Sequence, residues 1–224
     1  MTVIGNTRLQ LSEEQAMLLD VAREFCRDRS PVAAVRAGLD SASGYDPEIW
    51  REMAELGWAG VTLPEHCGGA GLGVGALVPV VEAMGRSLLA TPLVNATLAA
   101  QLLLRSAPGR FESELAAIAA GEVATPAWLE NEDCATQTFR CRLNEGGIIT
   151  GTKRYVGDAR SASLFVVTLG HPDGPALALV RREQLPEGAI EPHTLIDETR
   201  RAATVDFSGV QVASEALVTG PGVA

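Results

Sequence analysis

A change in residue pattern near residue 120 constrains the fold of this chain more than any other feature. Between about residues 11 and 120, leucine and alanine recur at helical spacing, whereas from about residue 123 short β-branched stretches alternate with glycine and proline turns. We therefore predict an α+β fold with a boundary near Gly121 and Glu122. An all-α helical domain is expected over residues 1–120, followed by a small antiparallel β-barrel or β-sheet domain over residues 121–224.

Capping signals mark the first two helices of the N-terminal half. Ser12 followed by Gln15 forms a capping box, in which each side chain satisfies a backbone donor of the other residue. Asp46 followed by Pro47 is the signal for the second helix, because proline fits the first helical turn. Helices are expected between residues 12 and 31, between 46 and 57, and over 74–88, 93–105 and 111–120. The predicted buried faces of the first two comprise Met17, Leu18, Val21, Ala22 and Phe25, and Ile49, Trp50, Met53 and Leu56.

The C-terminal half has the short, turn-bounded segments that are typical of strands. Gly146 and Gly147 separate two of these segments, which predicts an antiparallel hairpin. No helical pattern lies between the strands, so a sheet or barrel is favoured over β-α-β units. Strands are expected over residues 136–143, 148–155, 164–168, 176–180 and 204–207.

Charge and hydropathy narrow the class of protein. The 224 residues carry a formal charge of −10, which disfavours nucleic acid or an anionic membrane as a partner, because phosphate groups require clustered positive charge. No apolar run approaches the roughly 20 residues of a membrane span, and no secretory signal is visible. We expect a soluble, cytoplasmic protein. Its cysteines, which are scattered along the chain, are expected to be reduced and mostly buried: Cys26, Cys67, Cys134 and Cys141.

Several short motifs carry little chemistry in their context. Residues 71–76 spell the letters of a dinucleotide fingerprint, but no strand precedes them, so we reject a Rossmann site. His66 and Cys67 are adjacent, which does not let them act easily as base and nucleophile. His171 and His193 complete an irregular histidine set, and we predict no metal site.

Arg200 and Arg201 form the one basic pair that invites a functional interpretation. The two guanidinium groups either contact an anionic ligand or form a salt bridge at the surface or in an interface. Residue types alone do not decide between these roles.

A series of short motifs stands in the order found in one enzyme family. The motifs are Leu11-Ser12-Glu13-Glu14-Gln15, Arg23-Glu24-Phe25, Glu55-Leu56-Gly57, Pro64-Glu65, residues 68–71, residues 82–86, Gly151-Thr152-Lys153-Arg154-Tyr155-Val156 and residues 205–210. In this order and at these intervals, along nearly the whole chain, the sequence resembles the acyl-CoA dehydrogenase family.

The resemblance implies a flavoenzyme that acts on thioesters. Members bind FAD and remove hydrogen from Cα and Cβ of an acyl-CoA, with a carboxylate as base and the flavin as hydride acceptor. The family normally continues into a C-terminal helical bundle that carries this base. That bundle is absent from the sequence, which ends at Ala224, so we assign no catalytic residue here.

Two stretches correspond to the flavin-contacting segments of the family, and both depart from its pattern. The first stands here as Trp128, Leu129 and Glu130, with Glu130 in place of the expected hydroxyl group. The second is an aromatic-aliphatic-threonine triplet beside the isoalloxazine ring, which appears as Tyr155, Val156 and Gly157. These residues are the predicted FAD-binding set. Two hydroxyl groups of the family pattern are therefore missing.

The losses leave alternatives open. Residues 85–93 and 197–203 are similar to a branch that acts on steroid side-chain CoA thioesters, whose members often work as heteromers of unlike subunits. The chain is then either part of a working dehydrogenase, in a homo- or hetero-oligomer, or a non-catalytic partner or fragment with a degenerate flavin site. A flavin-dependent oxidase or monooxygenase on the same fold is a third alternative.

Overall fold

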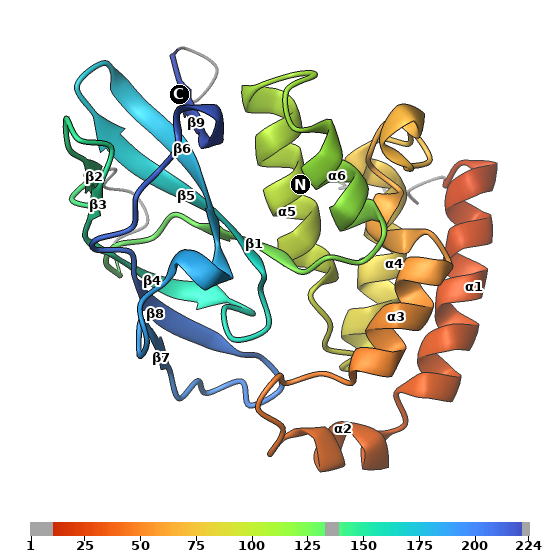
Figure 1. Cartoon of the computed structure of the whole chain (residues 1–224). Coiled ribbons are helices and arrows are strands. Elements are labelled where there is room, and N and C mark those ends of the chain that lie inside the picture. The colour runs from red at the N-terminus through yellow and green to blue at the C-terminus, as the bar shows by residue number, and fades with distance from the viewer. Residues whose placement is uncertain (1–10, 133–138, 221–224) are drawn as a thin grey trace, which may run out of the picture.

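Helices and strands occupy opposite sides of the molecule. The structure is a computed structural model that describes residues 11–132 and 139–220. Figure 1 shows the helices gathered on one side, the sheets on the other, and β1 running from the first group into the second. The helices are α1 (Glu13–Arg29), α2 (Val32–Gly38), α3 (Pro47–Glu55), α4 (Val74–Arg86), α5 (Leu93–Ser106) and α6 (Glu112–Ala119), with short 3-10 turns η1 (Trp58–Gly60), η2 (Glu65–Cys67), η3 (Arg182–Gln184) and η4 (Ser214–Ala216).

The strands form two sheets. They are β1 (Ala124–Ala127), β2 (Arg142–Leu143), β3 (Ile149–Thr150), β4 (Thr152–Gly157), β5 (Leu164–His171), β6 (Gly174–Arg181), β7 (Ile190–Pro192), β8 (Ala202–Asp206) and β9 (Leu217–Thr219). The six-stranded sheet has the order β3-β2-β5-β6-β9, with β1 paired to β5, and the three-stranded sheet has the order β4-β8-β7.

The predicted α+β fold is confirmed, with two corrections: the described strands form no closed barrel, and the six-stranded sheet is mixed, whereas the three-stranded sheet is antiparallel. Both β1 and β2 run parallel to β5, whereas β6 and β9 continue the sheet in antiparallel register. Because β1 enters directly from the helical half, it reaches β5 in parallel direction without a hairpin. The predicted hairpin around Gly147 is confirmed, with Arg142 opposite Thr150.

The capping predictions are confirmed for both helices. Ser12 and Gln15 form the reciprocal capping box of α1, and Asp46 accepts the Glu48 N–H at the start of α3. Helix α1 runs parallel to α4, since Gln15 donates to the carbonyl of Gly75.

The predicted buried faces of these helices are only partly correct. Met17 is 70% exposed, Val21 46% and Leu56 49%, whereas Ala22 and Cys26 are buried. Small residues let the α1 backbone approach α4 closely, so the packed stripe is rotated away from the larger side chains.

Two hydrophobic clusters hold the halves. One lies among the helices, extends to the face of β1 and β5 that α5 covers and includes residues of β6, and the other fills the space between the two sheets. The predicted boundary residues are fixed to both halves: the Gly121 carbonyl accepts the Trp50 indole N–H, and Glu122 pairs with Arg181 of β6. The division at residue 120 itself stays a prediction.

The described cysteines are buried, and the described helices lack the features of a membrane span. Cys26, Cys67 and Cys141 are free and buried, and burial raises the pKa of Cys26 and of Cys141 to about 11. Cys134 lies outside the described residues. Among the described helices none combines the length and hydropathy that crossing a membrane requires.

The glycine-rich loop between α3 and α4 is a close-packed turn. Its backbone bonds to itself, with Gly71 N–H donating to the Leu63 carbonyl and Ala70 N–H to the Gly60 carbonyl. A Cβ atom at Gly69 would overlap the Leu63 carbonyl oxygen and lie 2.5 Å from that of Gly60. Residues 71–76 therefore form the end of this loop and the first turn of α4, and a 3-10 turn precedes them in place of a strand.

We expect Gly69→Ala to destabilise the fold by about 2 kcal/mol or more, because rigid backbone meets the new methyl group. The control is Gly85→Ala at an exposed helical position with open space around it, which should stabilise by about 0.5–1 kcal/mol. Urea unfolding of both variants measures the difference. Equal stabilities would contradict the close packing of this loop.

Candidate functional site

The structure brings the two predicted flavin-contacting segments together. Residues 128–130 follow β1, and Tyr155 to Gly157 end β4. The Arg154 N–H donates to the Leu129 carbonyl at 2.7 Å, and Lys153 Nζ lies 3.4 Å from the Trp128 carbonyl. The segments are therefore hydrogen-bonded neighbours, although some 25 residues separate them in the sequence.

Glu130 is neutralised by a buried lysine. Lys153 Nζ lies 2.6 Å from Glu130 Oε1, and the exposed fractions of the two side chains are 0% and 8%. The ammonium also donates to Thr168 Oγ1, and the carboxylate accepts the backbone N–H groups of Arg140 and Cys141. The Glu130 charge is therefore paired inside the protein, and the place of Glu130 in the predicted FAD-binding set stays a prediction.

Tyr155 occupies a strained position at the edge of the site. Its φ is +52°, in a bulge where the register of β4 against β8 shifts between Lys153 and Val156. A non-glycine residue in this region is costly and is found where the surroundings impose it. The bulge turns the ring outward, since Tyr155 is 37% exposed while Val156 is 1% exposed.

Three side chains surround the Tyr155 ring. His193 meets it edge to face with 5.0 Å between ring centroids, and the Arg154 guanidinium lies 5.3 Å from its centroid. The tyrosine hydroxyl donates to Glu132 at 3.3 Å. His193 is in turn held by the Thr204 hydroxyl at 2.8 Å. The ring is fixed, with part of its surface left accessible.

The remaining predicted residues differ in what they offer. Trp128 is 52% exposed, so its ring is available to a ligand, whereas the buried Val156 side chain can offer only backbone. Gly157 lies against Asn95 of α5, and its carbonyl accepts the Thr125 hydroxyl at 2.7 Å.

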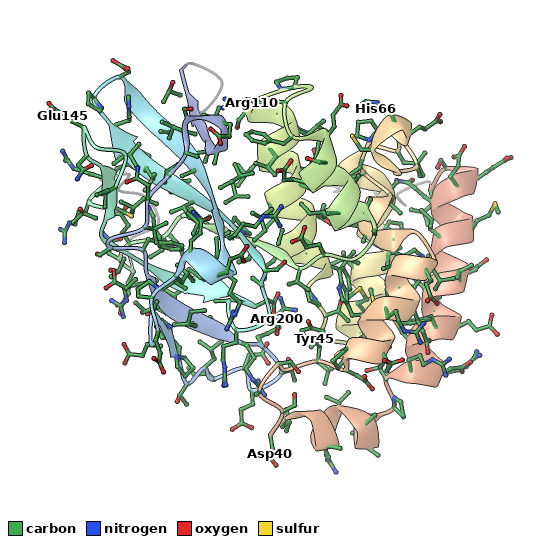
Figure 2. All side chains as sticks on the ribbon, in the orientation of Figure 1. Asp40, Tyr45, His66, Arg110, Glu145 and Arg200 are labelled. Atoms are coloured by element: carbon green, nitrogen blue, oxygen red, sulfur yellow. The ribbon has the colours of Figure 1, made fainter. Side chains whose placement is uncertain are left out.

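A buried carboxylate, Asp158, follows Gly157. It accepts a 2.7 Å hydrogen bond from Asn95 Nδ2. Burial raises its pKa above the ordinary value, and the Asn95 hydrogen bond and the Arg200 charge oppose this rise. Burial likewise raises the pKa of Tyr45, whose hydroxyl interacts with Ser161. Figure 2 shows Tyr45 and Arg200 at the junction of the two halves.

Sequence reasoning did not identify Asn95 or Asp158 as site residues, and it did not predict that Lys153 pairs with Glu130. Asn95 lies in an apolar helix with no local motif, and its partner is 63 residues away. Lys153 belongs to a quoted motif, but its pairing with Glu130 depends on how β1 and β4 lie together. The sequence offered one signal, which is that Lys153 lies within a predicted strand. In the structure this strand, β4, contains both buried and exposed residues.

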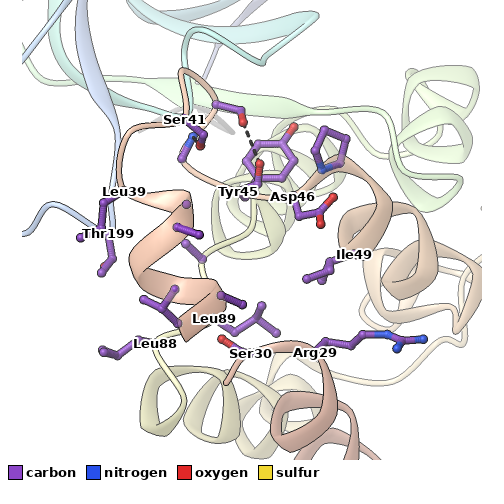
Figure 3. Close-up of a pocket in the computed structure, with 18 residues that line it drawn as sticks. Arg29, Ser30, Leu39, Ser41, Tyr45, Asp46, Ile49, Leu88, Leu89 and Thr199 are labelled. Atoms are coloured by element: carbon purple, nitrogen blue, oxygen red, sulfur yellow. Dashed lines mark hydrogen bonds between the residues drawn. The ribbon is translucent and has the colours of Figure 1, made fainter. Parts of the chain in front are cut away.

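The cavity in Figure 3 lies away from these residues. It measures about 500 Å³ and is bordered by α2, the ends of neighbouring helices and Thr199. Its charged groups have structural partners, because Arg29 pairs with Glu52 and Asp46 caps α3. Ser43, also in the lining, donates to the carbonyl of Tyr45, which Figure 3 shows at the upper end of the cavity. The cavity offers apolar surface without a free reactive group among its lining residues.

A second cavity of about 510 Å³ has a basic lining. Arg140, Arg142 and His171 border it, together with glycine and proline residues around the β5–β6 turn. Arg142 uses its Nε–H on the Phe139 carbonyl, and His171 lies 3.5 Å from Asp173. The lining can attract an anion, although the whole chain is acidic.

The other singled-out residues have structural contacts. Arg201 donates to the backbone carbonyls of Leu39 and Ser41, so it ties β8 to the segment after α2; this contact is neither of the expected roles of the arginine pair. His66 faces Glu112 at 3.6 Å, and Cys67 is buried. Within residues 11–132 and 139–220, no group of three histidine, cysteine or acidic side chains could hold a metal ion.

Comparison with known sequences identifies relatives of one enzyme class. A sequence model described as acyl-CoA dehydrogenase, N-terminal domain, matches residues 12–122. The acyl-CoA dehydrogenase IpdE2 of Mycolicibacterium smegmatis is 38% identical over 95 residues, which cover 42% of this chain and 30% of that protein. The acyl-CoA dehydrogenase FadE27 of Mycobacterium tuberculosis is 31% identical over 139 residues, covering 61% of this chain and 37% of that protein.

Solved structures show the same fold. A variant of the Tcur3481–Tcur3483 steroid ACAD has a TM-score of 0.78 and 30% identity, and the match covers 89% of this chain and 56% of that one. The ChsE4–ChsE5 complex from Mycobacterium tuberculosis has a TM-score of 0.81 at 22% identity, with 96% and 59% covered. The chain thus spans little more than half the length of these proteins.

We expect Lys153→Met to destabilise the protein by about 3–5 kcal/mol, because it leaves the Glu130 carboxylate buried without its cation. The double variant Lys153→Met/Glu130→Gln should regain at least half of this loss, since no unpaired charge stays buried and the amide oxygen can still accept one of the two backbone N–H groups. Denaturant unfolding measures both. A double variant as unstable as the single one would contradict the ion pair.

We expect Asp158→Asn to stabilise the protein more at neutral than at acid pH. The raised folded-state pKa means that Asp158 contributes stability at low pH and loses it as the pH rises through that pKa. A gain of about 1 kcal/mol corresponds to roughly 2–4 °C in Tm. Asp197→Asn is the control of opposite sign, because hydrogen bonds from Thr199 lower the pKa of Asp197. A Tm difference that does not change with pH would argue against a buried, titrating Asp158.

Proposed function

Because the chain belongs to the acyl-CoA dehydrogenase family, we propose that it forms part of an FAD-dependent enzyme that desaturates an acyl-CoA between Cα and Cβ. The observation that carries the proposal is the pairing of two segments at positions matching the family's flavin contacts. Trp128 and Tyr155 keep exposed aromatic surface there, on backbone that Arg154 and Leu129 fix by a hydrogen bond.

The residues present fit a flat aromatic cofactor. Tyr155 is held outward by a strained bulge, which is an energetic cost that a bound ligand explains better than a surface position does. Trp128 adds apolar surface, and Val156 and Gly157 offer backbone. Bound FAD would supply the hydride acceptor of the reaction. The role of this chain is to bind and orient the cofactor and to exclude water from it.

The carboxylates of this region already have partners within the chain, so we assign none of them as the catalytic base. Glu130 is paired with Lys153, and Asp158 accepts from Asn95 in a buried position. Glu132 is 77% exposed and accepts from Tyr155. Abstraction of the α-proton therefore requires a carboxylate from outside these segments, supplied by a longer chain or by a partner.

The basic cavity supports a CoA thioester as the substrate. The phosphate groups of CoA are anionic, and Arg142 presents a planar guanidinium group of the kind that binds phosphate oxygens in pairs. Arg140 adds to the positive potential of the same lining. In a chain with a formal charge of −10, this local reversal favours an anionic ligand.

The proposed assembly is a heteromer that acts on a steroid side-chain thioester. It is supported by the 30% identity with a protein titled a steroid ACAD. It is also supported by the engaged carboxylates of the described flavin-contacting segments and by the two hydroxyl groups that these segments lack. The second candidate is a non-catalytic partner subunit, which the same losses favour, and it predicts that another chain supplies most of the flavin contacts.

The visible absorbance spectrum tests the proposal. We expect the protein to carry a flavin band, in complex with its partner chain if not alone, and this band should bleach on adding a steroid side-chain acyl-CoA. Tyr155→Ala should weaken FAD binding about tenfold, because the ring contact is lost, whereas Tyr155→Phe keeps the ring and should bind normally.

The other outcomes separate the alternatives. A complex whose flavin bleaches equally with Tyr155→Ala would favour the non-catalytic partner role for this chain. Rapid reoxidation by oxygen would indicate an oxidase or monooxygenase. Absence of flavin from both the chain and the complex would refute the proposal.

A further inference from the structure

A side chain from the helical half occupies the space beside Gly157. An added Cβ at Gly157 would overlap Asn95 Nδ2, with Asn95 Cγ at 3.2 Å and Oδ1 at 3.4 Å. The φ of Gly157 is not in the left-handed region, so backbone conformation does not demand glycine here. A side chain at residue 157 would therefore displace the Asn95 amide from its present position.

Gly157 is also the position at which the family pattern has threonine. We propose that Asn95 supplies, from α5, the polar contact to bound FAD that residue 157 cannot make. This inference rests on the proposed function, since it needs a cofactor beside β4. It makes Asn95 a cofactor-binding residue that belongs to the helical half, outside both flavin-contacting segments.

Asn95 has the hydrogen-bonding capacity that this role requires. An asparagine amide has two N–H donors and an oxygen with two acceptor positions. Among residues 11–132 and 139–220, its one side-chain hydrogen bond runs from Nδ2 to Asp158 Oδ2 at 2.7 Å. One N–H and the amide oxygen stay available, and Asn95 is only half-buried, so a ligand can reach them.

Asp158 fixes the direction of the Asn95 amide. The Asp158 carboxylate is 6% exposed, and the nitrogen is the only end of the Asn95 amide that can donate to it, so the amide nitrogen faces Asp158. The two groups therefore form a rigid pair in place of a freely rotating side chain. A fixed amide contributes more to binding than a mobile one, because its rotamer entropy is already lost.

A second polar group of the same region lacks a partner. Thr91, which precedes the first turn of α5, is 2% exposed, and its Oγ1 is the buried side-chain polar atom of the described chain without a hydrogen bond. Leaving such a hydroxyl unpaired is unfavourable. It makes no hydrogen bond to Asn95, so the inference rests on Asn95, Asp158 and Gly157.

The test measures FAD affinity of the full chain, with its partner chain present if flavin binding requires it. We expect Asn95→Ala to weaken FAD binding about five- to tenfold, the effect of losing one hydrogen bond. The double variant Asn95→Ala/Gly157→Thr should regain most of this affinity, because the space is free and a hydroxyl returns. Leu98→Ala, at an exposed position of the same helix, is the control.

A purely structural role gives a different result. The Tm of each cofactor-free variant is measured in parallel, and the series is repeated with Asp158→Asn, where loss of Asn95 leaves no buried charge. The flavin reduction potential should shift in Asn95→Ala and return in the double variant. A structural contact would change Tm without moving this potential.

The FAD-binding results distinguish failure of this inference from failure of the proposed function. If the wild type binds FAD and Asn95→Ala binds it equally well, or the double variant regains nothing, the inference is overturned while the proposed function stands. If the wild type binds no FAD in any form, both fall together.

Discussion

The buried ion pair of Lys153 and Glu130 is the interaction on which the site depends. A fully buried ammonium is tolerated only when a countercharge and hydrogen-bond acceptors replace its water. Glu130 provides the charge and also binds two backbone N–H groups, while Thr168 of β5 provides a further acceptor. One charge pair thereby joins β4, β5 and the segment after β1, which are the elements that carry the predicted cofactor residues.

Polar contacts of the same kind fix the helical half against the sheets. Glu122 binds both Arg181 and Ser163, and Arg201 donates to backbone carbonyls of the segment after α2. Asn95 and Asp158 form a third contact, close to Gly157. Apolar packing alone is not directional, so these contacts decide how the two halves are oriented. The place where helix α5 meets the end of β4 is therefore defined well enough to bind a ligand.

Local signals could be predicted from the sequence, whereas contacts between distant segments could not. The capping box of Ser12 and Gln15 involves neighbouring residues, and so does the turn at Gly147. Helix α2 buries no side chain and has no side-chain cap, so neither an apolar stripe nor a capping motif in the sequence predicted it. Strand β1 contains Pro126, which disfavours a paired strand, yet the strand is tolerated because β5 is its one partner in the sheet. The partner of Glu130 is a matter of tertiary pairing, which residue spacing does not encode.

A missing motif residue is therefore weak evidence for a lost function. Judged along the chain, Gly157 is a lost hydroxyl, and Glu130 is a charge that disfavours a reduced flavin. In three dimensions the Glu130 charge is cancelled by Lys153, and the space beside Gly157 is filled by an amide that the sequence places 62 residues earlier. Selection acts on the chemical group that stands at a point in space, and either half of this molecule can deliver it there. Asn95 and Gly157 therefore have to be considered together, because the Asn95 amide occupies the space that the missing side chain of residue 157 leaves.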